Sequence, residues 1–367
     1  MNRNKIKNNA ISLFSGAGGM DVGFKNAGFD VLWANDADRD ACDTYRENFG
    51  EHIVLGDINN LLNTLDKYKN IDCLFGGPPC QGFSVAGNMD PNDERSKLVM
   101  SYMEAVSIVK PKVFVMENVK ALASLSKFSA VRENIIKKAH GMGYNTEMLI
   151  LNSKDFGVPQ SRERMFLIGF KNKKIDGSLN DNINKFKKES KTVKETIIHL
   201  GPAGSALNKK TVNAKISIAS SPILRKSAYA GMLFNGQGRP INPYSHSSTL
   251  HASMGGNRTP IIDEDQLYND EKSWVEEYHS HLINGGEPYP STSAPSRLRR
   301  LTVDEAHLLQ TFPKDFIFKG KQSSVFKQIG NAVPCSLAES VANLVNLILN
   351  GESSPSVIEK ENLDLIF

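Results

Sequence analysis

The chain has 367 residues, of which 40% are hydrophobic and 23% charged, a composition that excludes a disordered or collagen-like protein. The formal net charge of +4 permits binding to nucleic acid without requiring it. No apolar run approaches the roughly 18 residues that a membrane-spanning helix needs, and residues 1–9 are polar where a signal peptide would be apolar, so we expect a cytoplasmic protein outside the membrane.

The first half of the chain alternates short apolar runs with amphipathic stretches, as in a parallel α/β sheet. The pattern predicts a strand at Ala10–Phe14, a turn at Ser15–Gly19 and a helix that begins near Met20. Further strands are predicted at Val31–Ala34, Ile71–Phe75, Val113–Met116, Glu147–Leu151 and Met165–Phe170, and helices at Ala37–Phe49, Leu98–Val109 and Val131–Met142. This alternation predicts a doubly wound sheet.

The chain changes character at residues 171–298, which are rich in Lys, Asn, Ser, Gly and Pro and have few helical periods. We interpret this stretch as a separate irregular domain with a small core. The predicted core consists of Met232, Leu233, Phe234, Leu250, Ile261 and Ile262. A final helix is predicted at Pro334–Leu349, where apolar residues recur with a period near 3.6.

A glycine-rich turn, Phe14-Ser-Gly-Ala-Gly-Gly19, follows the first strand. In a dinucleotide-binding G-x-G-x-x-G loop the third glycine would fall at Asp21, which argues against a pyrophosphate site. Asp36 closes the second strand, where a carboxylate can hold a ribose, and Asp57-Ile58 closes a third apolar segment. These residues favour a nucleoside cofactor without a pyrophosphate, such as S-adenosylmethionine, over NAD.

One cysteine stands out by its neighbours. The four cysteines are Cys42, Cys73, Cys80 and Cys335, and none forms a C-x-x-C pair, so we expect no disulfide framework and no metal site. Cysteines of this kind are usually small buried hydrophobes. Cys80, however, follows Gly76-Gly-Pro-Pro at the end of a predicted strand, where open α/β sheets bind ligands and where two prolines fix the backbone. We therefore interpret Cys80 as a nucleophile.

Two further groups suit the same chemistry. A predicted strand ends in Glu117-Asn118, and a carboxyl group beside a thiol suits acid catalysis on a ring nitrogen, although a surface carboxylate is the plain alternative. Arg162 and Arg164 alternate, so they share one face and can meet a phosphate or a carbonyl oxygen, unless they are a solvated pair. A second basic group, 297–300, is either a nucleic-acid surface or a solvated run.

The sequence resembles the DNA cytosine-5 methyltransferase family of bacterial restriction-modification systems. The resemblance lies in four motifs and their order, which are the glycine turn, the Pro-Pro-Cys segment, Glu117-Asn118 and the arginines Arg162 and Arg164. Two later blocks agree with it, Arg299-Arg-Leu-Thr-Val-Asp-Glu305 and Gln328-Ile-Gly-Asn-Ala-Val-Pro334. The resemblance covers residues 10–170 and 297–349. It implies an α/β, doubly wound, Rossmann-like S-adenosylmethionine-dependent domain with a smaller irregular target-recognition domain. The implied limits are 1–175 for the catalytic domain, 176–322 for target recognition and 323–367 for a C-terminal helix that returns to the catalytic domain.

The resemblance also implies roles. Cys80 would attack carbon 6 of a cytosine flipped out of the duplex, Glu117 would protonate ring nitrogen 3, and Arg164 would bond the base carbonyl, with Arg162 helping to arrange thiol and phosphate. The implied S-adenosyl-L-methionine site consists of Phe14, Ser15, Gly16, Ala17, Gly18, Gly19, Asp36, Asp57, Ile58, Pro79, Leu98, Asn331, Ala332 and Val333. Asp36 and Ala37 depart from the family, in which Glu and a larger apolar residue are common at these positions.

Double-stranded DNA is the implied partner of this monomer, together with a cognate restriction endonuclease acting on the same site. A mobile lid is expected at Gln81–Lys97. The expected DNA-binding residues are Gln81, Ser84, Arg95, Arg239 and Thr249. Arg239 would read guanine, or else it is a structural arginine in a glycine-rich turn.

Three rival functions remain open from the sequence. The first is the same chemistry on tRNA, which the long variable region disfavours. The second is a catalytically silent DNA-binding module, which the intact Cys80, Glu117 and Arg164 disfavour. The third is a nicotinamide oxidoreductase, which Asp21 and the Pro-Pro-Cys block disfavour.

Overall fold

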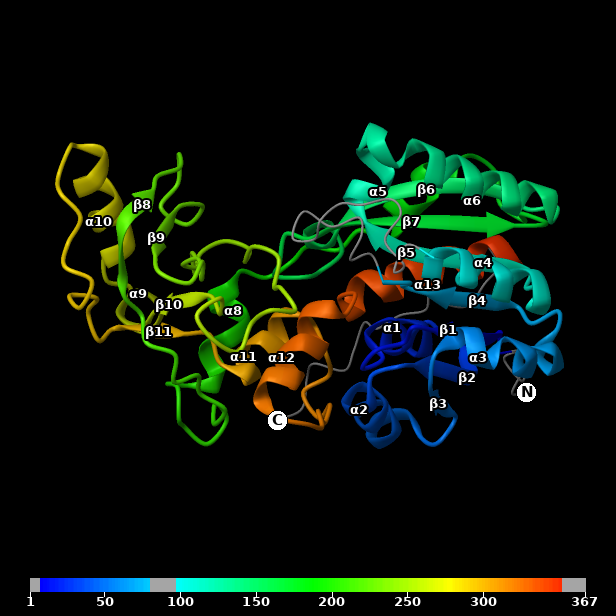
Figure 1. Cartoon of the computed structure of the whole chain (residues 1–367), viewed down its shortest axis with the longest axis horizontal. Coiled ribbons are helices and arrows are strands. Elements are labelled where there is room, and N and C mark those ends of the chain that lie inside the picture. Colours follow the sequence, from blue (N-terminus) through cyan, green and yellow to red (C-terminus); the bar gives the residue numbers. More distant parts are fainter. Residues whose placement is uncertain (1–6, 80–96, 352–367) are drawn as a thin grey trace.

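The computed structural model describes residues 7–79 and 97–351. Within them a seven-stranded sheet has the order β3-β2-β1-β4-β5-β7-β6 (Figure 1). The strands are β1 (Asn9–Leu13), β2 (Asp30–Asp36), β3 (Ile53–Leu55), β4 (Cys73–Gly76), β5 (Val113–Val119), β6 (Asn145–Asn152) and β7 (Glu163–Phe170). The predicted doubly wound, Rossmann-like fold is confirmed. The sheet is not wholly parallel, however, because β7 runs antiparallel to both β5 and β6. The segment 153–162 between β6 and β7 has no crossover helix of the length that a parallel return needs.

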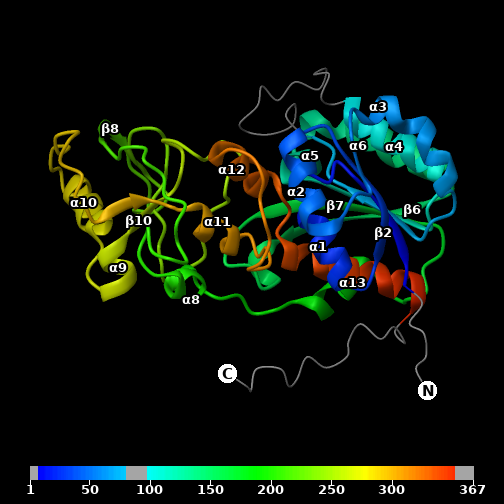
Figure 2. The ribbon, with the colours of Figure 1, turned by 90° about the horizontal axis from the view of Figure 1, so that it is seen from below.

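Helices cover both faces of the sheet (Figure 2). These helices are α1 (Gly19–Asn26), α2 (Arg39–Phe49), α3 (Ile58–Leu61), α4 (Lys97–Val109), α5 (Lys120–Ser124), α6 (Ser129–Gly141) and α13 (Cys335–Asn350). Side chains alternate along each strand, so Phe75 and Val115 pack with α1 and α13, while Leu74 and Phe114 pack with α4 and α6. Each predicted strand and helix of the first half is present, with its ends shifted by a few residues at most.

The last helix returns to the first one. A Cβ on Gly23 of α1 would clash with the backbone of α13 at Ala338 and Glu339, so glycine permits the close approach. Contrary to our expectation from the sequence, the stretch Gln322–Asn350 is long and apolar enough to cross a membrane. Its most apolar window is 83% buried inside the fold, as is usual for a core helix.

The irregular domain holds short elements around two cores. They are α8 (Val193–Ile197), β8 (Ile218–Ile223), β9 (Met232–Phe234), β10 (Ile261–Asp263), α9 (Glu264–Asn269), α10 (Trp274–Ile283), β11 (Leu298–Arg300), α11 (Val303–Leu309) and α12 (Gln322–Asn331). The helix α7 (Leu179–Ile183) precedes them and packs in the core of the sheet domain. Short 3-10 helices occur at Leu62–Tyr68, Ser126–Phe128, Ser153–Asp155, Asn184–Phe186 and Ile198–Leu200. The predicted single core is divided, since Leu233, Phe234 and Ile261 pack around Tyr278, whereas Leu250 and Ile262 join a cluster that reaches Ala17.

The predicted domain limits stay a prediction, but the packing bears on them. Leu179 and Ile183 of α7 belong to the core beneath α13, so the sheet domain extends past residue 175. The basic group at 297–300 is not a nucleic-acid surface. Arg297 pairs with Asp263 at 2.6 Å, Arg299 pairs with Glu305 at 2.6 Å, and Arg300 is buried against backbone carbonyls.

Candidate active site

The polar side chains singled out by the sequence gather at one edge of the sheet. The parallel strands β1, β2, β4 and β5 all end at this edge. Because β7 is antiparallel, it begins there, and its register places Arg164 opposite Val119 at the end of β5. The reversal of β7 therefore brings Arg164 to the carboxylate of Glu117.

Glu117 and Arg164 form an ion pair at the centre of this edge. The Arg164 Nε lies 3.0 Å from Glu117 Oε1, and both side chains are largely buried. Burial raises the pKa of the Glu117 carboxyl, and the charges of Arg164 and Arg162 oppose that rise without cancelling it. The second oxygen, Oε2, lies over Gly77, where an added Cβ would come within 2.8 Å of it. The result is a fixed carboxyl group that holds its proton more readily than an exposed one.

Asn118 connects this carboxylate to the turn after β4. Its Nδ2 donates to the Pro78 carbonyl at 3.2 Å, and its Oδ1 accepts from the backbone of Val119 at 2.9 Å. Pro79 is half-buried and is the last described residue before Cys80. Cys80, Gln81, Ser84 and Arg95 lie outside the described residues, as does the predicted lid except for its last residue, Lys97, which begins α4. The backbone that leads to Cys80 is thus held directly beside Glu117.

The glycine turn is organised by Asp36. Gly16 and Gly18 have positive φ angles of 54° and 90°, and Gly18 is the N-cap of α1. The Gly16 amide donates to Asp36 Oδ2 at 2.7 Å, and the Asp38 amide donates to Asp36 Oδ1 at 2.8 Å. Burial raises the pKa of Asp36. Since space is open beside Gly16 where a Cβ would stand, the turn can receive a ligand against its backbone.

Residues far apart in the sequence complete this corner. A Cβ on Gly19 would lie 2.7 Å from the Val333 carbonyl and 2.9 Å from the Ala332 Cβ. The segment 328–334 therefore packs directly against the glycine turn. Phe14 and Leu98 are half-buried and Ile58 is buried in the same hydrophobic cluster, while Asn331 is exposed. Asp57 caps α3 by accepting from the Asn59 amide at 2.9 Å. The structure brings the predicted cofactor residues to one corner, and carboxylates beside a glycine cradle suit a nucleoside cofactor.

Sequence reasoning missed the glutamines that hold this corner. Gln310 donates from Nε2 to the Ala332 carbonyl at 2.5 Å and accepts from Gln160 Nε2 at 2.5 Å. Gln160 in turn accepts from the Leu250 amide at 3.0 Å. These contacts join the irregular domain to the cofactor corner. No local pattern marks Gln310, because its partners are 22 and 150 residues away.

Arg162 and Arg164 do not act as a pair. Arg162 is buried, and its guanidinium donates to the carbonyls of Leu250 and Gly330 at 2.9 Å each. Those contacts join the irregular domain to the last block. Arg162 is thus a structural clamp among the described residues, whereas Arg164 faces the carboxylate.

Two loops of the irregular domain lie beside this edge. Thr249 donates to the Ser161 carbonyl at 3.1 Å, which ties its segment to the entrance of β7. Arg239 is exposed, and in the described part of the chain its guanidinium has no hydrogen bond or ion pair. Burial and the charges of four nearby arginines, Arg162, Arg239, Arg164 and Arg258, lower the pKa of His251. The mouth of the site is therefore strongly cationic.

A buried carboxyl group, which sequence analysis treated only as a missing glycine, lies behind the turn. Asp21 is fully buried and accepts from Ser12 Oγ at 3.0 Å and from Tyr45 at 2.9 Å. The Tyr45 hydroxyl also lies 3.1 Å from His52 Nε2. Burial raises the pKa of Asp21 to about 7.

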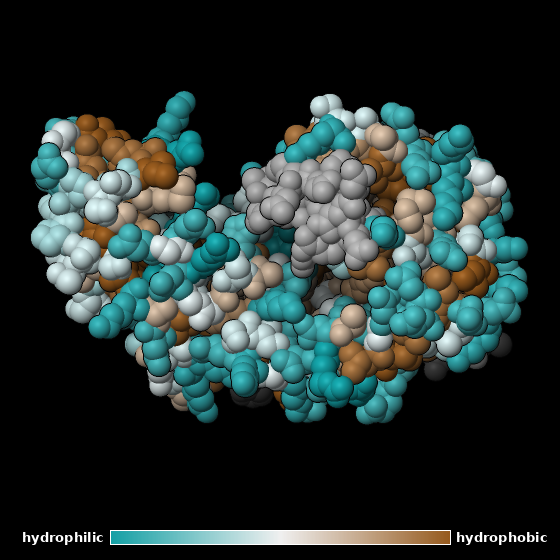
Figure 3. All heavy atoms as spheres, viewed as in Figure 1, coloured by the Kyte–Doolittle hydropathy of each residue, from teal (hydrophilic) through white to brown (hydrophobic). Residues whose placement is uncertain are grey.

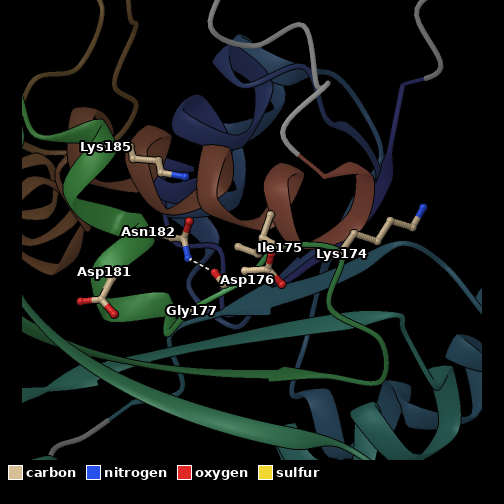
Figure 4. Close-up of a pocket in the computed structure, with 7 residues that line it drawn as sticks. All are labelled: Lys174, Ile175, Asp176, Gly177, Asp181, Asn182 and Lys185. Carbon is tan, nitrogen blue, oxygen red and sulfur yellow. Dashed lines mark hydrogen bonds between the residues drawn. The ribbon is translucent and has the colours of Figure 1, made fainter.

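An open depression lies away from this edge. It has a volume of about 600 Å³ and is lined by Lys174, Ile175, Asp176, Gly177, Asp181, Asn182 and Lys185 (Figure 4). Asn182 donates to the Asp176 carbonyl at 2.8 Å across it. None of the predicted site residues lines it, so we assign it no part in the chemistry.

Comparison with known proteins points to one family. A family profile described as C-5 cytosine-specific DNA methylase matches residues 8–346. Type II methyltransferase M1.HphI of Haemophilus parahaemolyticus is 33% identical over 91% of this chain and 86% of its own. Type II methyltransferase M.FnuDI of Fusobacterium nucleatum is 31% identical over 96% of this chain and 97% of its own. Among solved structures, the Entamoeba histolytica methyltransferase EhMeth matches in fold, with a TM-score of 0.66 at 19% identity over 93% of this chain and 98% of that one.

Proposed function

Because the chain belongs to the C-5 cytosine-specific DNA methylase family, we propose that it methylates carbon 5 of a cytosine flipped out of duplex DNA, through a covalent bond to Cys80 and with S-adenosylmethionine as the methyl donor. DNA cytosine-5-methyltransferase activity of the Type II restriction-modification class follows from the family and the relatives themselves. The base flipping, the covalent adduct, the cofactor and the residue roles are the proposal.

One observation carries the residue assignment. The Glu117–Arg164 pair lies beside the Pro78–Pro79 turn that leads to Cys80, and Asn118 bonds the strand of the pair to that turn. The turn that leads to Cys80 therefore lies next to an acid and a cation, which supports the assignment of Cys80 as the nucleophile. A base that is inside a duplex cannot reach such a place, so the cytosine must leave the stack, at a cost of about a few kcal/mol.

Three residues of the chain then carry out separate parts of the reaction. The Cys80 thiolate forms a bond to carbon 6 while Glu117 gives its proton to ring nitrogen 3, so negative charge does not accumulate on the ring. The raised pKa of Glu117 supports this role, because the carboxyl group keeps its proton at a higher pH than an exposed one. Arg164 holds the carboxyl group at Oε1 and offers its remaining donors to the base carbonyl. Once carbon 5 carries the methyl group, it loses its proton, the Cys80 thiolate leaves carbon 6 and the nitrogen-3 proton returns to Glu117, which restores the aromatic ring.

The cofactor corner fits S-adenosylmethionine, which supplies an electrophilic methyl group when bound. We assign the amino-acid part to the glycine turn at Gly16 and Gly18, and the ribose to Asp36. Asp57, Ile58, Leu98 and the segment 331–333 would surround the adenine. Asp36 is shorter than the glutamate that is common in the family, but its carboxylate is fixed at both oxygens.

The test is transfer of labelled methyl from S-adenosylmethionine to duplex DNA, followed by sequencing of the methylated cytosines. We expect label on carbon 5 with the wild type and none with Cys80→Ala, and a stable adduct with DNA containing 5-fluorocytosine only when Cys80 is present. Cys73→Ala is the matched control, because Cys73 is a buried thiol at the other end of β4. Label on RNA instead would favour the tRNA function, and no label on either would favour a silent DNA-binding module.

We also propose that the enzyme acts as a monomer in the cytoplasm and protects DNA from a partner endonuclease. The Type II relatives support that context. DNA methylated by this protein should resist an endonuclease that cleaves at the mapped site. Cleavage of the methylated DNA by such an enzyme would contradict the protective role.

A further inference from the structure

A carboxylate without a counter-charge is buried behind the glycine turn. Asp21 stands in the first turn of α1 and is fully buried. Its two oxygens accept hydrogen bonds from the hydroxyls of Ser12 and Tyr45, at 3.0 Å and 2.9 Å. Within residues 7–79 and 97–351, no lysine, arginine or histidine forms an ion pair with it. Burial of a carboxylate without a cation is unfavourable, so a compensating role is expected for this group.

The groups around Asp21 offer no positive charge either. Asp36, at the end of β2, adds a second negative charge that opposes the ionisation of Asp21. Burial raises the pKa of the Tyr45 hydroxyl from α2 and the pKa of the Cys335 thiol from α13, so both groups are neutral at pH 7. Ser12 of β1 is neutral at every pH. Among the described residues, hydrogen-bond donors alone hold the Asp21 carboxylate, and a positive charge has to come from a bound molecule.

A chain of hydrogen bonds leads from this carboxylate toward the surface. The Tyr45 hydroxyl lies 3.1 Å from the Nε2 atom of His52, a half-buried ring directly before β3. Burial lowers the pKa of His52, and the nearby charges of Asp30 and Lys25 act on that pKa in opposite directions. The ring is therefore neutral at pH 7, and a neutral imidazole can accept a proton at one nitrogen and release one from the other. Asp21 can thus exchange its proton with solvent although it is fully buried.

The carboxylate and the ligand side of the glycine turn lie close together in the fold. A Cβ on Gly18 would clash with the Phe49 ring and lie 3.2 Å from Tyr45 Cδ2, so α2 packs directly against the turn. The edge of the sheet that carries the turn faces the notch between the irregular domain and the sheet domain (Figures 1 and 3). Gly16 is half-buried at this edge, with open space beside it. A ligand at Gly16 and the Asp21 carboxylate therefore lie on opposite sides of one short turn.

We propose that the Asp21 carboxylate is a counter-charge that makes the site prefer S-adenosylmethionine over its product S-adenosylhomocysteine. The inference rests on the proposed function for its cofactor. The two molecules differ by one methyl group and by the positive charge of the sulfonium, which the thioether of the product lacks. An ionised Asp21 attracts the cation and gives the neutral thioether no such attraction. At an effective dielectric constant of about 20, opposite charges roughly 10 Å apart change affinity on the order of tenfold.

This preference should depend on pH, because only the ionised form of Asp21 carries the charge. Burial raises the pKa of Asp21 to about 7, so in the free protein the carboxyl group is neutral below that pH and ionised above it. Affinity for S-adenosylmethionine should rise roughly 5- to 10-fold between about pH 6 and 8, while affinity for S-adenosylhomocysteine stays nearly constant. Because a nearby cation favours the ionised form, binding of S-adenosylmethionine at pH 7 should also expel roughly 0.4 proton from Asp21.

The test is calorimetric binding of the two molecules to the full chain without DNA, between about pH 6 and 8, in two buffers of different ionisation enthalpy. Asp21→Asn mimics the neutral acid, because its amide can both donate and accept. This variant should show at every pH the affinity ratio that the wild type shows near pH 6. Comparison with the wild type also removes the contribution of the cofactor's own amino group to the measured protons.

Two further variants sharpen the test. Tyr45→Phe removes one hydrogen bond to the carboxylate, which disfavours the ionised form, so the change in affinity ratio should move to higher pH. Asp72→Asn is the matched control, because Asp72 lies at the other end of β1, where it accepts from the Asn9 amide at 2.9 Å. Asp72→Asn should keep the pH dependence of the wild type.

The outcomes separate this inference from the proposed function. A pH-independent ratio in the wild type, or an unchanged pH dependence in Asp21→Asn, overturns the inference even when methyl transfer is normal. Equal weakening of both molecules by Asp21→Asn at every pH also overturns it, in favour of a purely structural role. Absence of methyl transfer beside a pH-dependent ratio overturns only the proposed chemistry at Cys80. Failure of the wild type to bind S-adenosylmethionine overturns the cofactor assignment together with this inference.

Discussion

Replacing Gly77 by alanine tests whether the position of the Glu117 carboxyl group controls the reaction. The new Cβ would lie 2.8 Å from Glu117 Oε2, whereas ordinary van der Waals contact begins at 3.4 Å. The carboxyl group must therefore move by about 0.6 Å, away from a pair with Arg164 that measures 3.0 Å. Misplacement of about 1 Å can cost a hundredfold in rate, and a general acid contributes roughly 10²–10⁴-fold. We expect the rate of methyl transfer to fall roughly 10- to 100-fold.

The assay is single-turnover methyl transfer, with thermal unfolding measured alongside. The Gly77 backbone needs no positive φ, so we expect stability to change by less than about 1 kcal/mol. Gly141→Ala is the matched control, because a Cβ at Gly141 meets nothing within 4 Å. A rate for Gly77→Ala within twofold of the wild type would refute the role of the carboxylate position. So would an equal loss of rate in Gly141→Ala.

The remaining predictions concern the buried polar groups behind the site. Burial raises the pKa of Asp21 from 3.8 to about 7, so between these values the folded state holds a proton that the unfolded state has released. Stability should then fall by about 4 kcal/mol as pH rises from about 4 to 7, and Asp21→Asn should largely remove that fall in urea unfolding; an unchanged pH profile would contradict the assignment. Gln310→Ala leaves the Ala332 carbonyl and the Gln160 amide unpaired, so we expect a loss of about 2–4 kcal/mol of stability and weaker binding of S-adenosylhomocysteine by calorimetry. Asn346→Ala is the control, because it breaks hydrogen bonds to Asn8 and Ala27 and should lose stability without losing cofactor affinity. An equal loss of cofactor affinity in Asn346→Ala and Gln310→Ala would contradict the role of Gln310.

Much of the site could be predicted because its groups are local in sequence. The glycine turn needs its positive φ angles within three residues, and the prolines before Cys80 fix the backbone that carries it. The ends of parallel strands meet at one edge, so Asp36, Gly77 and Glu117 could be placed together before any coordinates. Long-range pairings could not be predicted in this way. Gln160 and Gln310 meet only because two domains pack.

The same contrast between local patterns and long-range contacts explains why the roles of the arginines could not be predicted. Alternation along a strand predicts that Arg162 and Arg164 share a face, but it does not say what lies opposite. The carbonyls of Leu250 and Gly330 accept hydrogen bonds from Arg162, so Arg162 links the irregular domain to the last motif. The reversed direction of β7 places Arg164 beside Glu117, with which it forms an ion pair. At 297–300, carboxylates from β10, α9 and α11 turned a basic run into an internal network.

The sequence by itself predicts the proposed chemistry, because the candidate nucleophile on a proline-fixed turn, the acid at a strand end and the glycine cradle are each set by residues near one another in the chain. Only the tertiary structure decided which polar groups are neutralised and which stay free. That outcome depends on partners far away in the chain, such as the Gly330 carbonyl that accepts from Arg162, and on the absence of a described partner for the guanidinium of Arg239. A cationic side chain can bind a DNA phosphate only where the fold has not already paired it with a carboxylate, and such pairing depends on tertiary packing.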